Sequence, residues 1–402
     1  MQPDIYTAKN HPIRQEKIDK DAMYVMAKLQ QAGFIAYLVG GSVRDLALGI
    51  TPKDFDIVTS AKPEEIKRLF TNCLLIGRRF RLAHLRFGKK IIEVSTFRSG
   101  DTSDGELILR DNVWGTPEED VLRRDFTING LFYDPQEHSV IDYVGGCKDL
   151  SKHLLRTIGP PDIRFKQDPV RMLRLLKFRA RFGFQVEKQT AHALYQCREE
   201  LFKSAPARVL EEFFKMLESA AATSFLRILD DSDFLQILLP HFATFLQNEN
   251  KERFFAYIHA ADECIKTDKT SITDRAVLLT TLFFPLLEQK ITSYLQTNDG
   301  MPPHFTEILT MTDLLIHEVT STAFFQIPKR LRFLTQFILC TQYRLTPIDN
   351  KRITRYRITK HPDFPLSLQF LHLRTHVHPE LKEPYSHWKK LVKHSHKHEK
   401  HA

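Results

Sequence analysis

The stretch that decides the fold lies near the N-terminus: LVGGSVRD at residues 38–45, followed by DFDIV at residues 54–58. An apolar, strand-like segment runs into Gly40 and Gly41, a short helical stretch follows, and the acidic segment opens a second strand. Glycines at such a turn let the backbone approach a bound group closely. This order of elements predicts a domain in which strands and helices alternate.

The character of the chain changes after the Gly-Pro-Pro turn at residues 159–161. Before it, strand and helix signals are mixed, and three strand-like segments stand out: residues 54–59, 82–87 and 91–97. After it, strand signals become scarce, and three segments are typical of amphipathic helices: residues 209–221, 225–237 and 274–287. We therefore expect an α+β fold, with a mixed sheet and helices in the N-terminal head and helices alone in the rest.

The composition limits the classes of protein that need to be considered. Lys and Arg number 58 against 49 Asp and Glu, and a net charge of +9 favours a polyanionic partner, with nucleic acid the first candidate. The five cysteines are dispersed and form no CxxC pair, which argues against a disulfide framework or a zinc motif and fits a reducing compartment. No apolar run approaches the ~18 residues of a membrane span, so we expect a cytoplasmic protein without membrane contact.

The acidic segment carries the strongest chemical signal. Residues two apart in a strand point to the same face, so Asp54 and Asp56 should project together. Their mutual repulsion is relieved by a hard divalent cation such as Mg²⁺, which prefers oxygen ligands. Upstream, Gly40, Gly41 and Ser42 precede a helix whose free N–H groups could face a phosphate. A phosphate turn followed by paired aspartates indicates metal-assisted attack on the α-phosphate of a nucleoside triphosphate.

A third carboxylate, Glu93, interrupts the apolar segment at residues 91–94. A charged side chain in such a strand is unfavourable unless it faces a cation or a polar site. Two interpretations stay open from the sequence: Glu93 joins the aspartates at a metal site, or it faces solvent on an edge strand.

Two further motifs follow downstream. In RRDFTIN, residues 123–129, the arginines offer forked donors to phosphate, while Asp125 and Asn129 would share a helix face; the alternative is a capped surface helix. In QDPVRMLR, residues 167–174, Asp168 and Arg171 could read the edge of a base. The alternative for this motif is a capped amphipathic helix with a local ion pair.

Together these motifs resemble the nucleotidyltransferase superfamily, in particular its bacterial poly(A) polymerase and tRNA CCA-adding branch. The resemblance implies that Asp54 and Asp56 hold catalytic Mg²⁺ (or Mn²⁺), that Asp125 is a further essential carboxylate, and that ATP is the substrate. It also implies a set of nucleotide-binding residues: Gly40, Gly41, Ser42, Arg44, Arg124, Asn129, Asp168 and Arg171. Gln167 departs from the family's EDxxR element, which has Glu at this position, and puts in doubt any role that needs a charge there.

The resemblance also implies how the chain is divided. We expect a nucleotidyltransferase head and a helical neck with the nucleotide-selecting element, then a helical body that binds RNA and a basic His/Lys tail: residues 1–160, 161–240, 241–388 and 389–402.

The poly(A) branch is favoured by the segment GRRFRLAHLRFG at residues 77–88, where CCA-adding enzymes commonly carry a Gly-Thr-containing segment. Four further segments resemble the polymerases: residues 109–112, 206–208, 327–331 and 361–364. The basic cluster of Arg78, Arg79, Arg81 and Arg86 could contact RNA phosphates, or it could be a solvated loop. The expected function is template-independent addition of AMP from ATP to RNA 3′ ends for RNA processing or decay. The alternatives are CCA addition to tRNA and a non-catalytic RNA-binding derivative.

Overall fold

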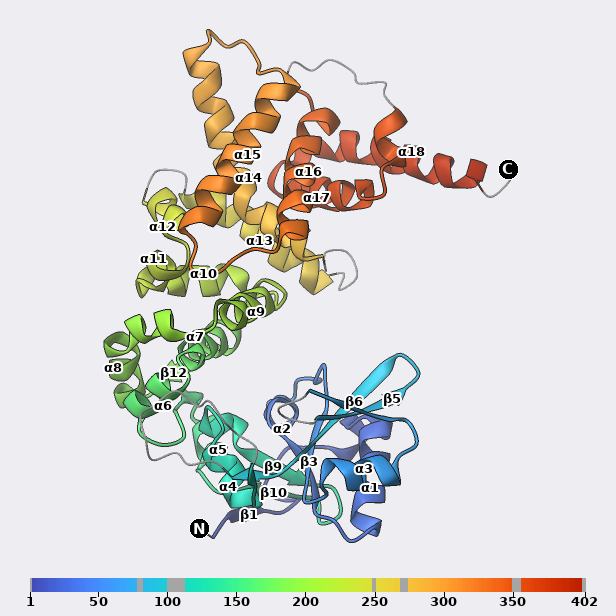
Figure 1. Ribbon diagram of the computed structural model, residues 1–402, viewed down its shortest axis with the longest axis vertical. Coiled ribbons are helices and arrows are strands. Elements are labelled where there is room, and N and C mark those ends of the chain that lie inside the picture. The colour runs from blue at the N-terminus through green and yellow to red at the C-terminus, as the bar shows by residue number, and fades with distance from the viewer. Residues whose placement is uncertain are drawn as a thin grey trace. The chain divides into compact units, whose positions relative to one another are not determined.

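The computed structural model divides into two compact units (Figure 1). The first comprises Met1–Arg179 and Gly183–Leu201, and the second comprises Ala180–Phe182 and Phe202–Ala402. The structure describes these residues: 2–77, 82–99, 113–247, 251–267, 274–348 and 356–399. Within them the first unit contains the mixed sheet and the second consists of helices, so the predicted α+β fold class is confirmed. The finer division into head, neck, body and tail stays a prediction.

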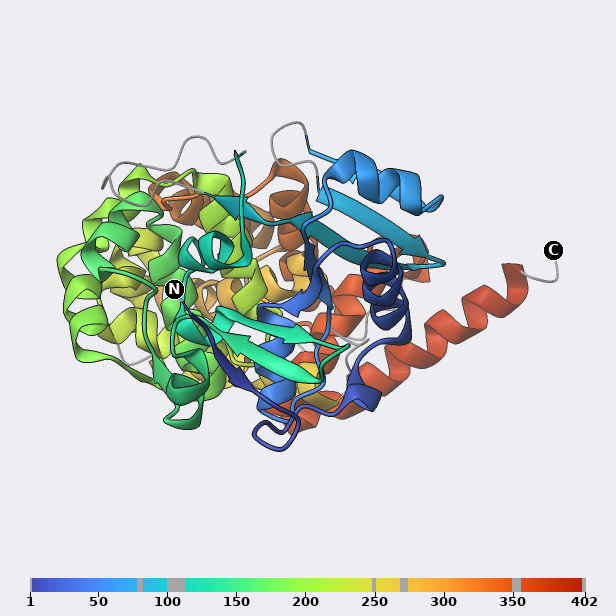
Figure 2. The same cartoon turned by 90° about the horizontal axis from the view of Figure 1, so that it is seen from below.

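An eight-stranded sheet organises the first unit, in the order β1-β10-β9-β2-β3-β6-β5-β4. Its strands are β1 (Asp4–Tyr6), β2 (Ala36–Val39), β3 (Asp56–Thr59), β4 (Cys73–Ile76), β5 (Leu82–Phe87), β6 (Lys90–Thr96), β9 (Leu131–Asp134) and β10 (Ser139–Asp142). Among the described strands of this sheet, β3 and β6 pair in parallel and the other pairs are antiparallel. Figure 2 shows β1 running beside the β9–β10 hairpin. Four short strands of the first unit form two separate two-stranded sheets: β7 (Arg98–Ser99) with β8 (Val113–Trp114), and β11 (Leu154–Leu155) with β12 (Gln185–Val186).

The helices of the first unit are short. They are α1 (Lys20–Gln31), α2 (Gly41–Ala47), α3 (Pro63–Leu69), α4 (Pro117–Leu122), α5 (Gly146–Ser151), α6 (Pro161–Gln167), α7 (Val170–Phe182, which ends in the second unit) and α8 (Lys188–Gln196). A core of seven buried apolar side chains ties sheet to helices: Val39, Val58, Phe97, Val121, Phe132, Ile141 and Ile158. Because strands β2, β3 and β9 all contribute to this core, their ends are held in a fixed register.

The second unit is built from helices packed around aromatic and aliphatic side chains. Its helices are α9 (Pro206–Leu217), α10 (Ala222–Asp231), α11 (Phe234–Leu238), α12 (Pro240–Leu246), α13 (Lys251–Thr267), α14 (Arg275–Thr297), α15 (Phe305–Thr322), α16 (Lys329–Leu345), α17 (Phe364–Val377) and α18 (Lys382–Glu399). The single helix predicted over residues 225–237 is wrong, because Asp233 adopts a left-handed conformation (φ 61°) that separates α10 from α11. Among the described residues, no helix is long and apolar enough to cross a membrane.

A turn beside β10 positions the segment that carries RRDFTIN. The buried Asp142 carboxylate accepts hydrogen bonds from the backbone N–H groups of Val144, Gly145, Gly146 and Cys147. This turn brings Gly146 so close to the 3₁₀ turn η2 (Thr127–Asn129) that a Cβ atom on Gly146 would lie 2.2 Å from the Thr127 carbonyl oxygen. A side chain at Gly146 would therefore push η2, and Asn129 with it, out of place.

We accordingly predict that Gly146→Ala lowers the free energy of unfolding by about 1–3 kcal/mol, the range for inserting a methyl group against packed backbone. The matched control is Lys152→Ala at the exposed end of α5, which should change stability by less than about 0.5 kcal/mol. Thermal unfolding followed by circular dichroism measures both variants. A Gly146→Ala protein as stable as the parent would contradict the close approach.

Candidate active site

The structure brings the predicted carboxylates together at the start of β3. Asp56 is the first residue of this strand, which begins two residues later than the strand predicted from the sequence, and Asp54 lies two residues before it. Asp56 pairs in register with Glu93 of β6, so their side chains lie on the same face of the sheet. Strand β6 lies between β3 and β5, and the interpretation of Glu93 as an edge-strand residue is therefore wrong.

The charges of these groups are coupled. Partial removal from water raises the pKa of Asp56 to about 6, the negative charges of Glu93 and Asp54 add to the rise, and Arg124 opposes it. Asp56 nevertheless remains accessible to solvent at the end of its strand, and water screens part of this repulsion. Asp54, Asp56 and Glu93, which we call the acidic recess, are all exposed to water, and together they would stabilise a cation.

A histidine that the sequence motifs did not single out borders this recess. His84 of β5 is the register partner of Glu93, and its Nε2 lies 3.3 Å from Glu93 Oε1. The His84 side chain is 16% exposed and that of Glu93 is 47% exposed. His84 therefore orients Glu93 from the side away from Asp56. The antiparallel pairing of β5 with β6 creates this contact, which no local motif records.

The glycine turn lies next to Arg124. Gly40 has a positive φ of 69°, which favours glycine, and a Cβ atom there would lie 3.5 Å from Arg124 Nη1. Gly41 opens α2. The buried Ser42 donates its hydroxyl to the Val39 carbonyl oxygen at 3.0 Å and so fixes the turn.

Arg124 itself is anchored from two sides. Its Nη2 lies 2.7 Å from Asp120 Oδ2, and its guanidinium lies 5.6 Å from the centroid of the Phe132 ring. These contacts leave the guanidinium of Arg124 beside the glycine turn and within electrostatic range of Asp56. An anionic group at the turn would thus meet a positioned donor.

A buried network joins α2 to the RRDFTIN segment. The Arg44 guanidinium donates to Asp45 Oδ1 through Nε (2.9 Å) and Nη2 (2.7 Å), and to Asn129 Oδ1 through Nη1. Asn129 Nδ2 in turn donates to Asp125 Oδ1 at 2.9 Å. The helix that the sequence predicts across Asp125 and Asn129 does not form. The 3₁₀ turn η2 brings the two side chains together instead.

Asp125 lies among cationic and amide groups. Burial alone would raise its pKa, but Arg174, the Asn129 amide and Arg171 hold it below the ordinary value of an aspartate. Arg174 Nη1 lies 3.6 Å from Asp125 Oδ2. These contacts show that Asp125 joins Asn129 of η2 to Arg174 of α7. Its predicted role as an essential carboxylate stays a prediction.

Asp168 and Arg171, which the sequence predicts to select the nucleotide, lie where α6 meets α7. Asp168 follows the last residue of α6, and its carbonyl oxygen accepts the backbone N–H of Arg171 at 3.0 Å. Arg171 is buried rather than on an exposed polar face, and it donates to the carbonyl oxygens of Arg164 (3.2 Å) and Arg123 (3.0 Å). Arg171 therefore supports the backbone next to RRDFTIN.

Arg164 is a second residue that sequence motifs missed. It is buried, donates through Nη2 to the Arg124 carbonyl oxygen at 2.8 Å, and donates through Nη1 to Gln167 Oε1 at 2.9 Å. Burial and the neighbouring Arg171 lower the pKa of Arg164 to about 9, although Asp125 and Asp168 oppose this. Gln167, which stands where the family has Glu, thus gives Arg164 a hydrogen bond without a negative charge.

Arg123 extends this cluster of arginines. Burial and then the positive charges of Arg98, Arg124 and Arg171 lower the pKa of Arg123 to about 10. Mutual repulsion of buried guanidinium groups is relieved when a polyanion binds among them. The cluster is therefore suited to a triphosphate.

Two further features predicted from the sequence are the basic cluster and the polymerase-like segments. Of the basic cluster, Arg86 lies exposed on β5, whereas Arg78, Arg79 and Arg81 lie outside the described residues. The polymerase-like segment at residues 109–112 also lies outside them.

Three family descriptions match the chain along most of its length. "Poly A polymerase head domain" matches residues 36–156, and "Probable RNA and SrmB- binding site of polymerase A" matches residues 183–246. "Polymerase A arginine-rich C-terminus" matches residues 299–402. The first of these contains the acidic recess and the glycine turn.

Individual proteins similar to this chain include a poly(A) polymerase and CCA-adding enzymes. The poly(A) polymerase I of Escherichia coli O6:H1 is 38% identical over 395 residues, which is 94% of this chain and 82% of that protein. The CCA-adding enzyme of Lactobacillus helveticus is 40% identical over 210 residues, 50% of this chain and 52% of that one. Among solved structures, the Bacillus stearothermophilus CCA-adding enzyme in complex with CTP shares the fold: the TM-score is 0.60 at 23% identity, covering 91% of this chain and 82% of that chain.

Fold and matches together define the class of protein as a nucleotidyltransferase. Since the similarity to a poly(A) polymerase extends over nearly the whole chain, this protein belongs to the poly(A) polymerase family, as the sequence motifs predicted.

The acidic recess generates a prediction for stability and pH. The pKa of Asp56 is about 6 in the folded protein and 3.8 ordinarily, so ionising Asp56 at neutral pH destabilises the fold. As the pH falls through 6, Asp56 is protonated in the folded state before it is protonated in the unfolded state. The free energy of unfolding that its ionisation removes is therefore progressively recovered down to about pH 4. With allowance for solvent screening, Asp56→Asn should raise the free energy of unfolding by about 1 kcal/mol at pH 7.5 in the presence of EDTA.

The gain in the free energy of unfolding from Asp56→Asn should shrink steadily between pH 6 and pH 4, as measured by thermal unfolding across this range. Glu137→Gln, in the exposed turn between β9 and β10, is the matched charge-removing control and should show no such trend. A destabilised Asp56→Asn protein at pH 7.5 would show that the carboxylate is not repelled by its neighbours.

Proposed function

We propose that this chain transfers AMP from ATP to the 3′ hydroxyl of RNA, without a nucleic-acid template, and releases pyrophosphate. The observation that carries the proposal is the acidic recess of Asp54, Asp56 and Glu93. It lies beside a glycine turn and a cluster of arginines, in a chain similar to poly(A) polymerase I over 94% of its length. Such a site places a metal-binding group and an anion-binding group side by side.

The donor set of the recess fits Mg²⁺ or Mn²⁺. Carboxylate oxygens are the ligands these ions prefer, and three of them lie together here; removal of Asp56 from water raises its pKa most, and the charges of Glu93 and Asp54 add to that rise. Asp54 and Asp56 would hold the metal, with Glu93 as the third carboxylate. Bound there, the metal supplies Lewis-acid stabilisation of the charge that develops on the phosphate oxygens and lowers the pKa of the attacking hydroxyl.

The remaining site residues act on the nucleotide. Arg124 would donate to the triphosphate at the Gly40–Gly41 turn, and the neighbouring arginines would contribute positive charge. Arg44 holds Asn129, Asn129 holds Asp125 and Asp125 contacts Arg174, so this network keeps the residues beside the turn in position. Donors held in place before the nucleotide binds need not reorganise when charge develops during transfer.

Asp168 and Arg171 remain the proposed nucleotide-selecting pair. Because Arg171 also supports the backbone of Arg123, its replacement should weaken ATP binding as well as base selection. Base choice by protein groups would account for nucleotide addition without a template.

The proposed reaction also implies where the RNA binds, what its extension is for and where in the cell it takes place. The helical second unit, which includes most of the region described as RNA-binding in the family, would hold the RNA strand. We propose that the RNA is extended for processing or decay, and that this takes place in the cytoplasm, where ATP and RNA ends are both available.

A nucleotide-addition assay tests the proposal. Purified protein with a generic RNA, Mg²⁺ and either ATP or CTP should yield long adenylate tails with ATP and little product with CTP. The double variant Asp54→Ala/Asp56→Ala should lose at least about 10³-fold in rate, because the metal-dependent stabilisation of the transition state is lost. It should bind RNA as well as the parent in a gel-shift assay.

Efficient CTP use, or arrest after three additions, would overturn the poly(A) proposal in favour of CCA addition. That second function is favoured by the 40% identity to a CCA-adding enzyme across half the chain. Unchanged activity in the double variant would refute the assigned carboxylates. A parent inactive with both nucleotides would point to a non-catalytic RNA-binding derivative.

A further inference from the structure

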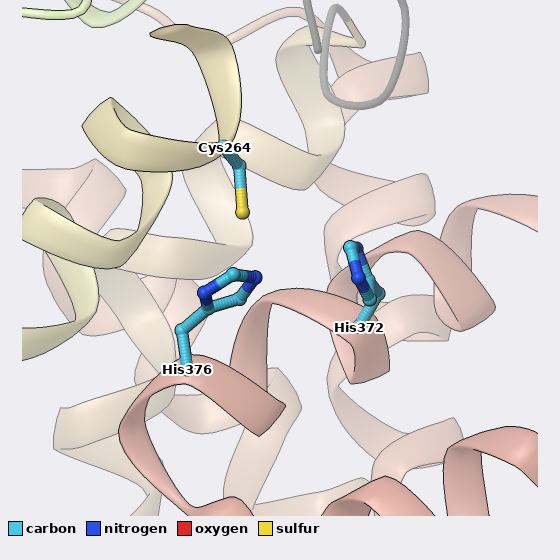
Figure 3. Close-up of side chains that lie close together, drawn as sticks. All are labelled: Cys264, His372 and His376. Carbon is cyan, nitrogen blue, oxygen red and sulfur yellow. The ribbon is translucent and has the colours of Figure 1, made fainter. Parts of the chain in front are cut away.

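A second group of metal-ligating side chains lies in the helical unit. Cys264 of α13 faces His372 and His376 of α17, and one ligand atom from each residue lies within 4.8 Å of the other two. Figure 3 shows the Cys264 sulfur pointing from α13 towards the imidazole rings on α17. His372 and His376 are four residues apart in one helix, so both rings project from the same face.

The two helices are held in register around this group. On α13, the buried Asp262 accepts hydrogen bonds from the backbone N–H groups of Ala222 and Thr223 at 2.9 Å, which fixes α13 against α10. At the end of α17, His378 Nε2 lies 3.1 Å from the hydroxyl of Tyr257 on α13. The His378–Tyr257 contact therefore resists sliding of α17 along α13, and it keeps the three side chains near one another before an ion binds.

The side chains themselves are also oriented. The His372 ring packs on the Tyr385 ring, with centroids 4.8 Å apart, and the two histidine rings are 5.3 Å apart at 79°. Cys264 is buried, His372 is half-buried and His376 is exposed. The group thus has a thiol on its inner side and an opening to solvent beside His376.

We propose that Cys264, His372 and His376 bind a Zn²⁺ ion that joins α13 to α17, with a water molecule as the fourth ligand. One sulfur and two imidazole nitrogens form a ligand set that Zn²⁺ favours, and hard ions such as Mg²⁺ do not. In a tetrahedral zinc site such atoms lie about 3.3–3.7 Å apart, so the ligands need to close by roughly 1 Å. The exposed position of His376 leaves its side chain room to rotate towards the other two ligands.

The net charge of the site stays small when the ion binds. Glu263, which adjoins Cys264, pairs with Lys266 at 2.8 Å and interacts more weakly with His259 and His376. On binding, the Cys264 thiol gives its proton to solvent and the sulfur binds as thiolate, so the ion with its three protein ligands keeps a single positive charge. The site lies outside the acidic recess and does not depend on the proposed reaction.

Cobalt spectroscopy tests this proposal. The full-length, reduced chain is stripped with a chelator and titrated with Co²⁺ in millimolar Mg²⁺, which occupies carboxylate sites. We expect a sulfur-to-cobalt charge-transfer band that saturates at one equivalent, tetrahedral visible bands, and loss of both when Zn²⁺ is added. Histidines in the C-terminal tail and the aspartates of the recess contain no sulfur, so cobalt bound to them gives no such band.

Co²⁺ titration of single-residue variants identifies which side chains bind the ion. Cys264→Ser should abolish the charge-transfer band, and Cys73→Ser on β4 is the matched control that should retain it. His376→Ala, at an exposed position that tolerates change, should weaken Co²⁺ binding by more than about tenfold, since the loss of a direct ligand exceeds the effect of losing an outer partner. Circular dichroism confirms that each variant is folded.

A parent protein without the charge-transfer band at one equivalent would overturn the proposal. The same holds for a band that survives in Cys264→Ser, or for unchanged affinity in His376→Ala. In those cases the three side chains only pack against each other. If Cys264→Ser fails to fold, the His376→Ala titration still decides the question.

Discussion

The parallel pairing of β3 with β6 is the constraint on which the site depends. Backbone hydrogen bonds hold Asp56 and Glu93 in register on one face, with Asp54 two residues before the strand, so the backbone keeps Asp56 and Glu93 side by side despite their repulsion. Seven buried apolar side chains from the sheet and its neighbours stabilise that arrangement. The fold thereby maintains a concentration of negative charge that a divalent cation would neutralise.

The rest of the head supplies the opposite charge. Arg124 faces the glycine turn, and Arg164 and Arg171 support the backbone on either side of it by donating to the carbonyl oxygens of Arg123 and Arg124. Asp125 and Asn129 form an inner layer that is fixed to α2 by Arg44. The carboxylates and the arginines thus come from different elements of one sheet-centred unit. Under the proposed function, the carboxylates would bind the metal and the arginines would face the triphosphate.

The sequence predicted those parts of the fold and site that are local. The DFD segment, the glycine turn and the spacing of Asp125 and Asn129 each place groups through residues close in the chain, and the structure brings them together. Glu93 could be paired with Asp56 only once the strand order was known, because the crossover to β6 determines that register. Arg164 belongs to no motif, since its importance comes from packing under residues some 40 positions earlier. The expected helix at Asp125 was wrong because a 3₁₀ turn meets the same spacing.

The central claim is that Asp54 and Asp56 hold a divalent ion next to the nucleotide. Anomalous diffraction from crystals soaked in Mn²⁺ and a non-hydrolysable ATP analogue measures this directly. The account predicts an anomalous peak within about 2–2.5 Å of carboxylate oxygens of both aspartates, with the triphosphate lying towards Arg124 and the Gly40–Gly41 turn. An analogue bound with its metal peak away from these two carboxylates would contradict it.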